Sequence, residues 1–267
     1  MINEAIFNQK QFFLIAGPCV VESEAVCFEI AETVKQITDE LGIQYIFKAS
    51  FKKANRTRLD SFTGIGDKKA LDILQQVKSK FSIPVLTDIH SVMDVSLASK
   101  YVDVLQIPAF LCRQTDLLIA AGKSQLPVNI KKGQFLNAAA MEHAIEKVRS
   151  TGNNQIMVTE RGNSFGYGDL IVDFRNIPIM QSFGYPVILD ATHAVQQPNQ
   201  QEGVSGGTPQ FIKTLVNAGM AVGVNGLFLE THPNPIKGLS DSTNMLPLKK
   251  LKSLLINAMR IRNSLID

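Results

Sequence analysis

Eight short apolar segments recur along the chain, separated mostly by stretches whose apolar residues have helical spacing. Most of the segments are continuously apolar, which is typical of parallel strands covered on both faces. Apolar residues three and four positions apart in the intervening stretches indicate amphipathic helices. The predicted strands cover residues 12–16, 45–47, 84–87, 102–107, 128–130, 156–159, 187–189 and 227–229. The predicted helices cover residues 22–41, 67–81, 91–100, 114–121, 138–150, 174–183, 208–218 and 248–265.

Two residues affect the helix predictions directly. Gly42 follows the first helical stretch and is a candidate C-terminal cap, because glycine readily adopts the left-handed conformation found there. Pro178 lies inside the stretch 174–183 and makes it the least regular of the predicted helices.

Alternating strands and helices predict a parallel sheet. Eight such units favour a closed (β/α)8 TIM barrel of the α/β class, formed by a single domain over residues 1–267. This length suits one large barrel domain, which commonly has ~200–250 residues. An open doubly wound sheet stays as an alternative, since periodicity alone does not show closure. In a barrel, the active site forms at the carboxyl ends of the strands.

Composition excludes several classes of protein. With 45% hydrophobic and 19% charged residues, the chain is not collagen-like, coiled-coil or disordered. A net charge of +3 is too small for a whole-protein nucleic-acid surface, and no run reaches the ~18 apolar residues of a membrane helix. The three cysteines, Cys19, Cys27 and Cys112, have no CxxC spacing and indicate reduced thiols. We therefore expect a cytoplasmic protein that binds neither nucleic acid nor membrane.

Positive charge is concentrated just after several predicted strands. The segment 48–58 contains five cations and no acid: Lys48, Lys52, Lys53, Arg56 and Arg58. Such a run is often a solvated loop. Its position after a strand instead favours an anion site, because lysine and arginine bind phosphate and carboxylate groups. Lys131 and Arg161 follow two further strands, so cations from three strands predict a strongly anionic, phosphorylated substrate.

Potential metal ligands follow the first, seventh and eighth predicted strands. They are Cys19, His193, Glu230 and Asp241. They have no motif spacing; a lone cysteine is often a buried apolar residue, and a lone histidine is often only hydrogen-bonded. Barrel closure would make the first and eighth strands neighbours. A mixed sulfur, nitrogen and oxygen donor set suits a divalent ion such as Zn²⁺, Fe²⁺ or Mn²⁺.

Motifs from the first strand to the last resemble those of the 3-deoxy-D-manno-octulosonate 8-phosphate synthase family. The similar segments are Gly17-Pro18-Cys19, Lys53-Ala54-Asn55-Arg56, Thr87-Asp88-Ile89-His90, Gln106-Ile107-Pro108-Ala109-Phe110-Leu111, Asn129-Ile130-Lys131, Thr159-Glu160-Arg161-Gly162, Asp190-Ala191-Thr192-His193 and Glu230-Thr231-His232-Pro233. Each is short, but the combination is specific.

The resemblance implies a homotetrameric enzyme that condenses phosphoenolpyruvate with arabinose 5-phosphate and releases phosphate. Related barrels that make a heptulosonate phosphate or sialic acid are the enzyme alternatives. The segment Lys53-Ala54-Asn55-Arg56 distinguishes this chain from the heptulosonate phosphate synthases, which typically have Lys-Pro-Arg there. A non-catalytic sugar-phosphate sensor is the alternative outside enzymes; it would need the cations but not Asp88, His90 or the metal-ligand types.

The resemblance also implies roles for individual residues. The residues implied for phosphoenolpyruvate are Lys53, Lys131 and Arg161, with Lys48 and Gln106 nearby. Those implied for the pentose phosphate are Asn55, Arg56, Thr57 and, from a neighbouring subunit, Arg113. Ser50 completes the substrate-binding set. The catalytic set is Asp88, His90, Lys53 and Asn55.

Two positions depart from part of that family. Thr57 stands where many members have serine, and either hydroxyl can contact a phosphate. Cys19 stands where the metal-independent branch has asparagine. The resemblance therefore implies the metal-dependent branch, with Cys19, His193, Glu230 and Asp241 as ligands.

Overall fold

The computed structural model describes residues 6–7, 9, 11–56, 59–165, 167–197 and 206–265. Within these residues, eight parallel strands follow one another around a ring: β1 (Phe13–Gly17), β2 (Gln44–Lys48), β3 (Val85–Asp88), β4 (Val104–Ile107), β5 (Val128–Lys131), β6 (Ile156–Glu160), β9 (Val187–Asp190) and β12 (Gly226–His232). Strand β12 pairs with β1, which closes the ring. The predicted (β/α)8 barrel is confirmed, and the open sheet is excluded.

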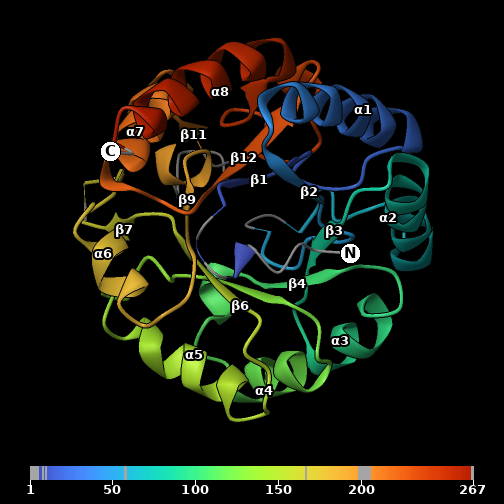
Figure 1. The fold of residues 1–267 in the computed structure, drawn as a ribbon. Coiled ribbons are helices and arrows are strands. Elements are labelled where there is room, and N and C mark those ends of the chain that lie inside the picture. The colour runs from blue at the N-terminus through green and yellow to red at the C-terminus, as the bar shows by residue number, and fades with distance from the viewer. Residues whose placement is uncertain are drawn as a thin grey trace.

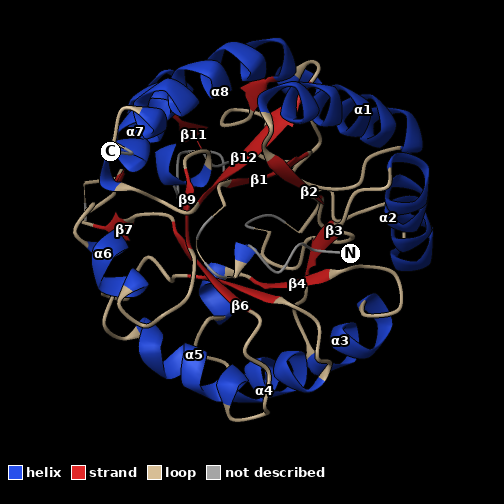
Figure 2. Cartoon of the chain, in the orientation of Figure 1, coloured by secondary structure: helices blue, strands red, loops and turns tan. Residues whose placement is uncertain are grey.

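A helix follows each strand and packs on the outside of the barrel, as Figures 1 and 2 show. The helices are α1 (Glu24–Leu41), α2 (Asp67–Phe81), α3 (Val92–Ala98), α4 (Thr115–Lys123), α5 (Met141–Arg149), α6 (Asn176–Gln181), α7 (Ile212–Val222) and α8 (Leu248–Asn263). Among the described segments, none of these helices combines the length and apolar character needed to cross a bilayer.

The helix ends follow from local sequence. Gly42 adopts a left-handed conformation with φ of 65° and caps α1, as predicted. Pro178 fits α6 because it lies in the first turn, where the backbone N–H groups have no partner inside the helix. The predicted helix 208–218 was wrong in its bounds. A 3₁₀ turn occupies Pro209–Phe211, and α7 continues to a left-handed Gly223, a stop signal that the prediction overlooked.

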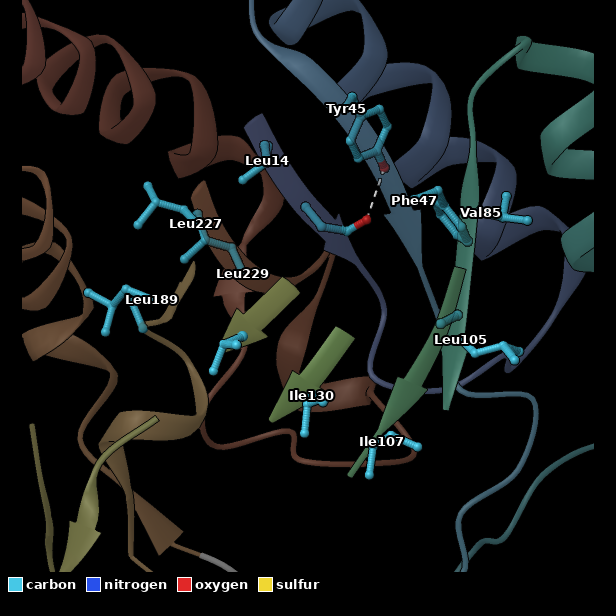
Figure 3. Packing of buried hydrophobic residues seen from close by; sticks show 14 of the residues in the cluster. Leu14, Tyr45, Phe47, Val85, Leu105, Ile107, Ile130, Leu189, Leu227 and Leu229 are labelled. Atoms are coloured by element: carbon cyan, nitrogen blue, oxygen red, sulfur yellow. Dashed lines mark hydrogen bonds between the residues drawn. The ribbon is translucent and has the colours of Figure 1, made fainter. Parts of the chain in front are cut away.

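Alternation along each strand separates two apolar cores. On β1, Leu14 and Ala16 face outward and join the large core between barrel and helices. Figure 3 shows this outer layer, in which the Tyr45 hydroxyl donates to the carbonyl oxygen of Ala16 at 3.1 Å. Phe13 and Ile15 belong to a separate cluster inside the barrel. The barrel interior is thus filled with side chains, as expected for this fold.

The inner apolar layer gives way to polar side chains at the carboxyl ends of the strands. A strand's side chains alternate between faces, so residues two positions apart share a face. Ile46, Leu86, Val104, Ile188 and Phe228 of the inner cluster are followed two positions later by Lys48, Asp88, Gln106, Asp190 and Glu230. The fold therefore directs this set of buried polar groups toward one end of the barrel.

Short strand pairs that the sequence did not predict surround the same end. They are β7 (Asn163–Ser164) with β8 (Leu170–Ile171), β10 (Gln196–Gln197) with β11 (Gly206–Gly207), and β13 (Leu246–Pro247) beside β12. They belong to the loops that follow β6, β9 and β12.

Candidate active site

A cavity of about 440 Å³ lies at the carboxyl ends of the strands. Small-molecule sites commonly measure ~300–1,000 Å³, so this volume suits a small-molecule site. The predicted site residues on its wall are Lys48, Lys53, Asn55, Arg56, Asp88, His90, Gln106, Lys131, Arg161, His193 and Asp241. The fold therefore brings most of the predicted residues together.

The other predicted residues lie elsewhere. Ser50, Cys19 and Glu230 are buried and do not form part of the cavity wall. Arg113 is exposed and also lies off the wall. Thr57 falls outside the described residues.

Lys131 and Arg161 are two buried cations of the cavity wall. The Lys131 ammonium hydrogen-bonds to Asp190, and its Nζ lies 3.4 Å from the centroid of the Phe228 ring. Burial lowers the pKa of Lys131, although Asp190 opposes that shift. Arg161 donates from NH2 to Oε1 of Gln196 at 2.9 Å, while its buried NH1 has no hydrogen-bond partner in the described structure. Because an unsatisfied charged donor is costly to bury, this arrangement indicates an anion-binding site.

A chain of hydrogen bonds orients Asp88. The Thr159 hydroxyl donates to Oδ1 of Asn129 at 2.8 Å, and Nδ2 of Asn129 donates to Oε1 of Gln106 at 2.8 Å. Nε2 of Gln106 donates to Oδ1 of Asp88 at 2.6 Å, and the Ser50 hydroxyl donates to Oδ2. A carboxylate only accepts, so the orientation of both amides is fixed. Ser50 thus acts on Asp88 rather than on the cavity.

Asp88 and Lys48 are both held in their charged forms. Burial alone would raise the pKa of Asp88, but the charges of Lys48 and Lys53 hold it well below its usual range. Burial would lower the pKa of Lys48, but Glu230 and Asp88 together raise it. Nζ of Lys48 lies 2.9 Å from Glu230 and 3.5 Å from Asp88. The buried charges therefore compensate one another.

Asp88 should stabilise the fold at neutral pH and lose that contribution in acid. A carboxylate with a depressed folded-state pKa stabilises the protein above its unfolded-state pKa of ~3.9, and the stabilisation is lost as the pH falls toward the folded value. We expect Asp88→Asn to lower the free energy of unfolding near neutral pH by about 1.5–3 kcal/mol. Urea unfolding between pH ~3 and ~7 should show a shallower acid dependence for the variant. Parallel curves for the two proteins would contradict this expectation.

His90 faces the cavity as a neutral imidazole. Its Nδ1 lies 3.7 Å from Asp94 and makes no hydrogen bond within the described structure. Burial lowers the pKa of His90 despite the carboxylates of Asp88 and Asp94. A neutral imidazole can accept or pass on a proton near pH ~7. Lys53 and the exposed Asn55 also line the cavity beside this group.

Arg56 connects two loops of the cavity wall. Its Nε donates to the carbonyl oxygen of Phe62 at 3.1 Å, and its NH2 donates to the hydroxyl of Ser240. The loop after β2 and the loop after β12 are thereby joined through one guanidinium group. Its charge remains available to a bound phosphate on the same wall.

Three predicted metal ligands form a compact cluster in which Cys19 and Glu230 are buried and Asp241 is half-buried. One ligand atom from each of Cys19, Glu230 and Asp241 lies within 4.8 Å of the others. The Cys19 thiol donates to Oδ2 of Asp241 at 2.9 Å. Burial raises the pKa of Cys19 well above its usual value, and the two carboxylates raise it further. A divalent cation would offset that cost and stabilise the thiolate, so the donor set fits a metal site.

His193 lies beside this cluster. Its Nε2 is 3.5 Å from Glu230 and 4.0 Å from Asp241. Its Nδ1 is 2.7 Å from Oδ2 of Asp190. A carboxylate on one imidazole nitrogen fixes the ring and its tautomer, which leaves the other nitrogen free as a ligand. The orientation of His193 thus suits the predicted fourth ligand, outside the compact group of three.

Sequence reasoning assigned no role to Asp190, Gln196, Ser240 or Phe228. Asp190 follows directly after a predicted strand, so its position was an available signal. Phe228 is indistinguishable from an ordinary core residue in the sequence. Gln196 and Ser240 lie in loops without periodicity, and only the fold shows that they contact Arg161 and Cys19.

Comparison with known proteins gives a consistent result. The profile of the DAHP synthetase I family matches residues 3–265. A protein of Desulfatibacillum aliphaticivorans named 2-dehydro-3-deoxyphosphooctonate aldolase is 52% identical over 94% of this chain and 92% of its own length. Proteins of the same name from Francisella tularensis subsp. holarctica and a Cyanothece species are each 49% identical, over 95% and 98% of this chain and 92% and 96% of their own. The chain therefore belongs to the DAHP synthetase I family.

Proposed function

We propose that this enzyme condenses phosphoenolpyruvate with D-arabinose 5-phosphate and water, yielding 3-deoxy-D-manno-octulosonate 8-phosphate and phosphate. The step belongs to the synthesis of lipopolysaccharide in the cytoplasm. The observation that carries the proposal is one cavity whose wall combines buried cations with Asp88 and His90, and which reaches the Cys19, Glu230 and Asp241 cluster through Asp241. The name shared by its near-full-length relatives supports the same reaction.

Phosphoenolpyruvate would bind beside the buried cations Lys131 and Arg161. Lys131, Arg161 and Lys53 would neutralise its carboxylate and phosphate, with Lys48 and Gln106 beside them. The unpartnered NH1 of Arg161 supports this placement. Two parallel N–H donors on a guanidinium match an oxyanion in geometry as well as charge.

The pentose phosphate would lie in the part of the cavity that contains the exposed Asn55. Arg56 and Asn55 line the cavity there, and Thr57 follows them in the chain. Their side chains would bind the phosphate group, which would leave the aldehyde directed inward toward Asp88 and His90.

The reaction then requires a carbon nucleophile and a water molecule. C3 of phosphoenolpyruvate attacks the aldehyde carbon, water adds at C2, and the tetrahedral intermediate loses phosphate. Lys131 and Arg161 stabilise the charge that develops on the carboxylate and phosphate. Neutral His90 can move a proton to or from the reacting centre, and the negative charge of Asp88 stabilises positive charge that develops there.

A divalent metal would be held by Cys19, His193, Glu230 and Asp241, as in the metal-dependent branch. Zn²⁺, Fe²⁺ and Mn²⁺ all tolerate this mixed donor set. When bound, the ion supplies a Lewis acid in the cavity. Asp190 holds the His193 ring in place for that role.

The function is tested by incubating the protein with both substrates and measuring free phosphate. We expect phosphate only when phosphoenolpyruvate and arabinose 5-phosphate are both present. N-acetylmannosamine in place of the pentose tests a sialic acid synthase, and a four-carbon aldose phosphate tests a heptulosonate phosphate synthase. Binding without phosphate release from any pair would indicate a sugar-phosphate sensor.

Arg56→Ala should separate the two substrates. Loss of a charge-assisted contact to phosphate costs about 1.5–3 kcal/mol, or roughly 10–150-fold in binding. We expect KM for arabinose 5-phosphate to rise by that factor and KM for phosphoenolpyruvate to change little. Steady-state kinetics with each substrate varied in turn provides the measurement. Equal rises in KM for the two substrates would refute the role assigned to Arg56.

The enzyme would assemble as a homotetramer in which Arg113 completes a neighbouring site. Arg113 is exposed and off the wall of its own cavity, which fits that arrangement. Mixing inactive Arg113→Ala subunits with inactive Arg161→Ala subunits should restore part of the activity, because some sites would then contain both arginines. Mixed oligomers verified by native mass spectrometry that remain inactive would count against a shared site.

A further inference from the structure

Gln196 on β10 connects the proposed anion site to the proposed metal site through one side chain. Its Oε1 accepts a hydrogen bond from NH2 of Arg161 at 2.9 Å, and its Nε2 donates to Oδ1 of Asp241 at 3.2 Å. Arginine only donates and a carboxylate only accepts, so the two partners fix the orientation of the amide.

Each partner keeps one functional atom free of Gln196. The amide contacts NH2 of Arg161, while the buried NH1 has no hydrogen-bond partner among the described residues. The amide also contacts Oδ1 of Asp241, while Oδ2 faces the Cys19 thiol at 2.9 Å. Gln196 therefore holds both groups and leaves NH1 of Arg161 and Oδ2 of Asp241 for an anion and a metal.

The backbone of Gln196 is anchored independently of these contacts. Gln196 pairs with Gly207 of β11, and Nδ2 of Asn244 donates to the carbonyl oxygen of Gly206 at 3.2 Å. A Cβ atom at Gly207 would lie 1.5 Å from Oδ1 of Asn244, so a larger residue there would displace the Asn244 side chain. The strand pair thus holds the amide at a fixed position between its two partners.

We infer that Gln196 is a positioning residue that couples divalent-metal binding to the binding of phosphoenolpyruvate. The inference rests on the proposed function of these two sites. A metal held by Asp241 would fix its carboxylate, and the amide that donates to Oδ1 would then fix the Arg161 guanidinium. Residues that hydrogen-bond to a metal ligand commonly tune its site in this way.

The test measures binding without turnover, using Zn²⁺ and phosphoenolpyruvate in the absence of any aldose. Calorimetric titration of the wild-type protein should show that Zn²⁺ tightens phosphoenolpyruvate binding, within the ~5–150-fold range typical of coupled sites. Direct attraction between the ion and the anion contributes part of that factor. Gln196→Met keeps the side-chain length and removes both hydrogen bonds, so we expect the factor to fall at least about threefold. Phosphoenolpyruvate should tighten Zn²⁺ binding by the same factor in each protein, because coupling is reciprocal.

Gln197→Met is the matched control. Gln197 is the neighbouring residue of β10, and its Nε2 contacts Asp169 at 2.8 Å on an exposed part of the surface. The Gln197→Met variant should keep the full factor by which Zn²⁺ tightens phosphoenolpyruvate binding in the wild-type protein. Gln196→Asn is one methylene shorter and cannot span both partners, so it should lose coupling like Gln196→Met and replaces that variant if it misfolds.

The outcomes separate this inference from the proposed function. If wild-type protein binds no Zn²⁺ or no phosphoenolpyruvate, the proposed function itself fails. If it binds both and the Gln196 variants keep the wild-type coupling factor, the inference is overturned and the proposed function stands. The inference is also overturned, and the proposed function stands, if the wild-type protein binds both ligands but neither tightens binding of the other.

Discussion

Removal of the divalent metal should abolish turnover, and Cys19→Ala should have the same effect through loss of a ligand. A Lewis acid lowers a reaction barrier by several kcal/mol, so we expect the rate to fall by about 100-fold or more when the metal is removed. Phosphate release by chelator-treated protein, with metal content verified by elemental analysis, provides the measurement. Adding back Zn²⁺, Fe²⁺ or Mn²⁺ should restore the wild-type rate and leave Cys19→Ala inactive.

The two other cysteines serve as matched controls. Cys27 and Cys112 are buried free thiols, but neither belongs to the metal cluster. Their alanine variants should therefore retain metal. Cys19→Ala should keep its circular dichroism spectrum, because a chain of 267 residues forms its core without metal. Cys19→Asn reproduces the residue type of the metal-independent branch and tests whether chelator-resistant activity returns. Full activity of rigorously metal-free wild-type enzyme would refute the metal dependence.

Lys131→Met should damage both stability and activity. It leaves the buried Asp190 carboxylate without its lysine partner, and breaking a buried ion pair costs about 3–5 kcal/mol. Loss of a charged contact to phosphoenolpyruvate should lower kcat/KM for that substrate by about 10–150-fold. Urea unfolding and steady-state kinetics on the same preparations measure the two effects.

A second substitution separates these effects. Asp190→Asn in the Lys131→Met background removes the uncompensated charge, so the double variant should regain much of its stability. Its use of phosphoenolpyruvate should stay impaired, because the cation is still missing. Recovery of both properties together would show that Lys131 acts only through folding.

The site residues at the strand ends were predictable from the sequence because two regularities of this fold coincide there. Parallel strands in this fold are continuously apolar, and the site forms where each apolar run stops. Lys131 and Arg161 each follow such a run, and the cavity contains both. The clustering of candidate metal ligands was predictable once closure was assumed, because β12 pairs with β1 and brings Glu230 beside the segment that contains Cys19.

The hydrogen-bonding partners of these residues were not predictable in the same way. Gln196 lies in a strand of two residues, which is too short to produce a periodic pattern. Its contacts with Arg161 and Asp241 depend on three loops meeting in space. For Ser50, the sequence predicts the position but not the contact. It follows a strand, but only the side-chain geometry shows that it hydrogen-bonds to Asp88 instead of lining the cavity.

Pairing of the first strand with the last has a consequence for the order of folding. Cys19 and Asp241 are 222 residues apart in the chain but lie in contact once the barrel closes. A chain emerging from the ribosome displays the thiol early and cannot assemble the full ligand set until its C-terminal segment is free. The entropy of closing so long a loop must be offset before the ligands meet. Metal uptake during refolding should therefore follow barrel closure, and its time course would report that late step.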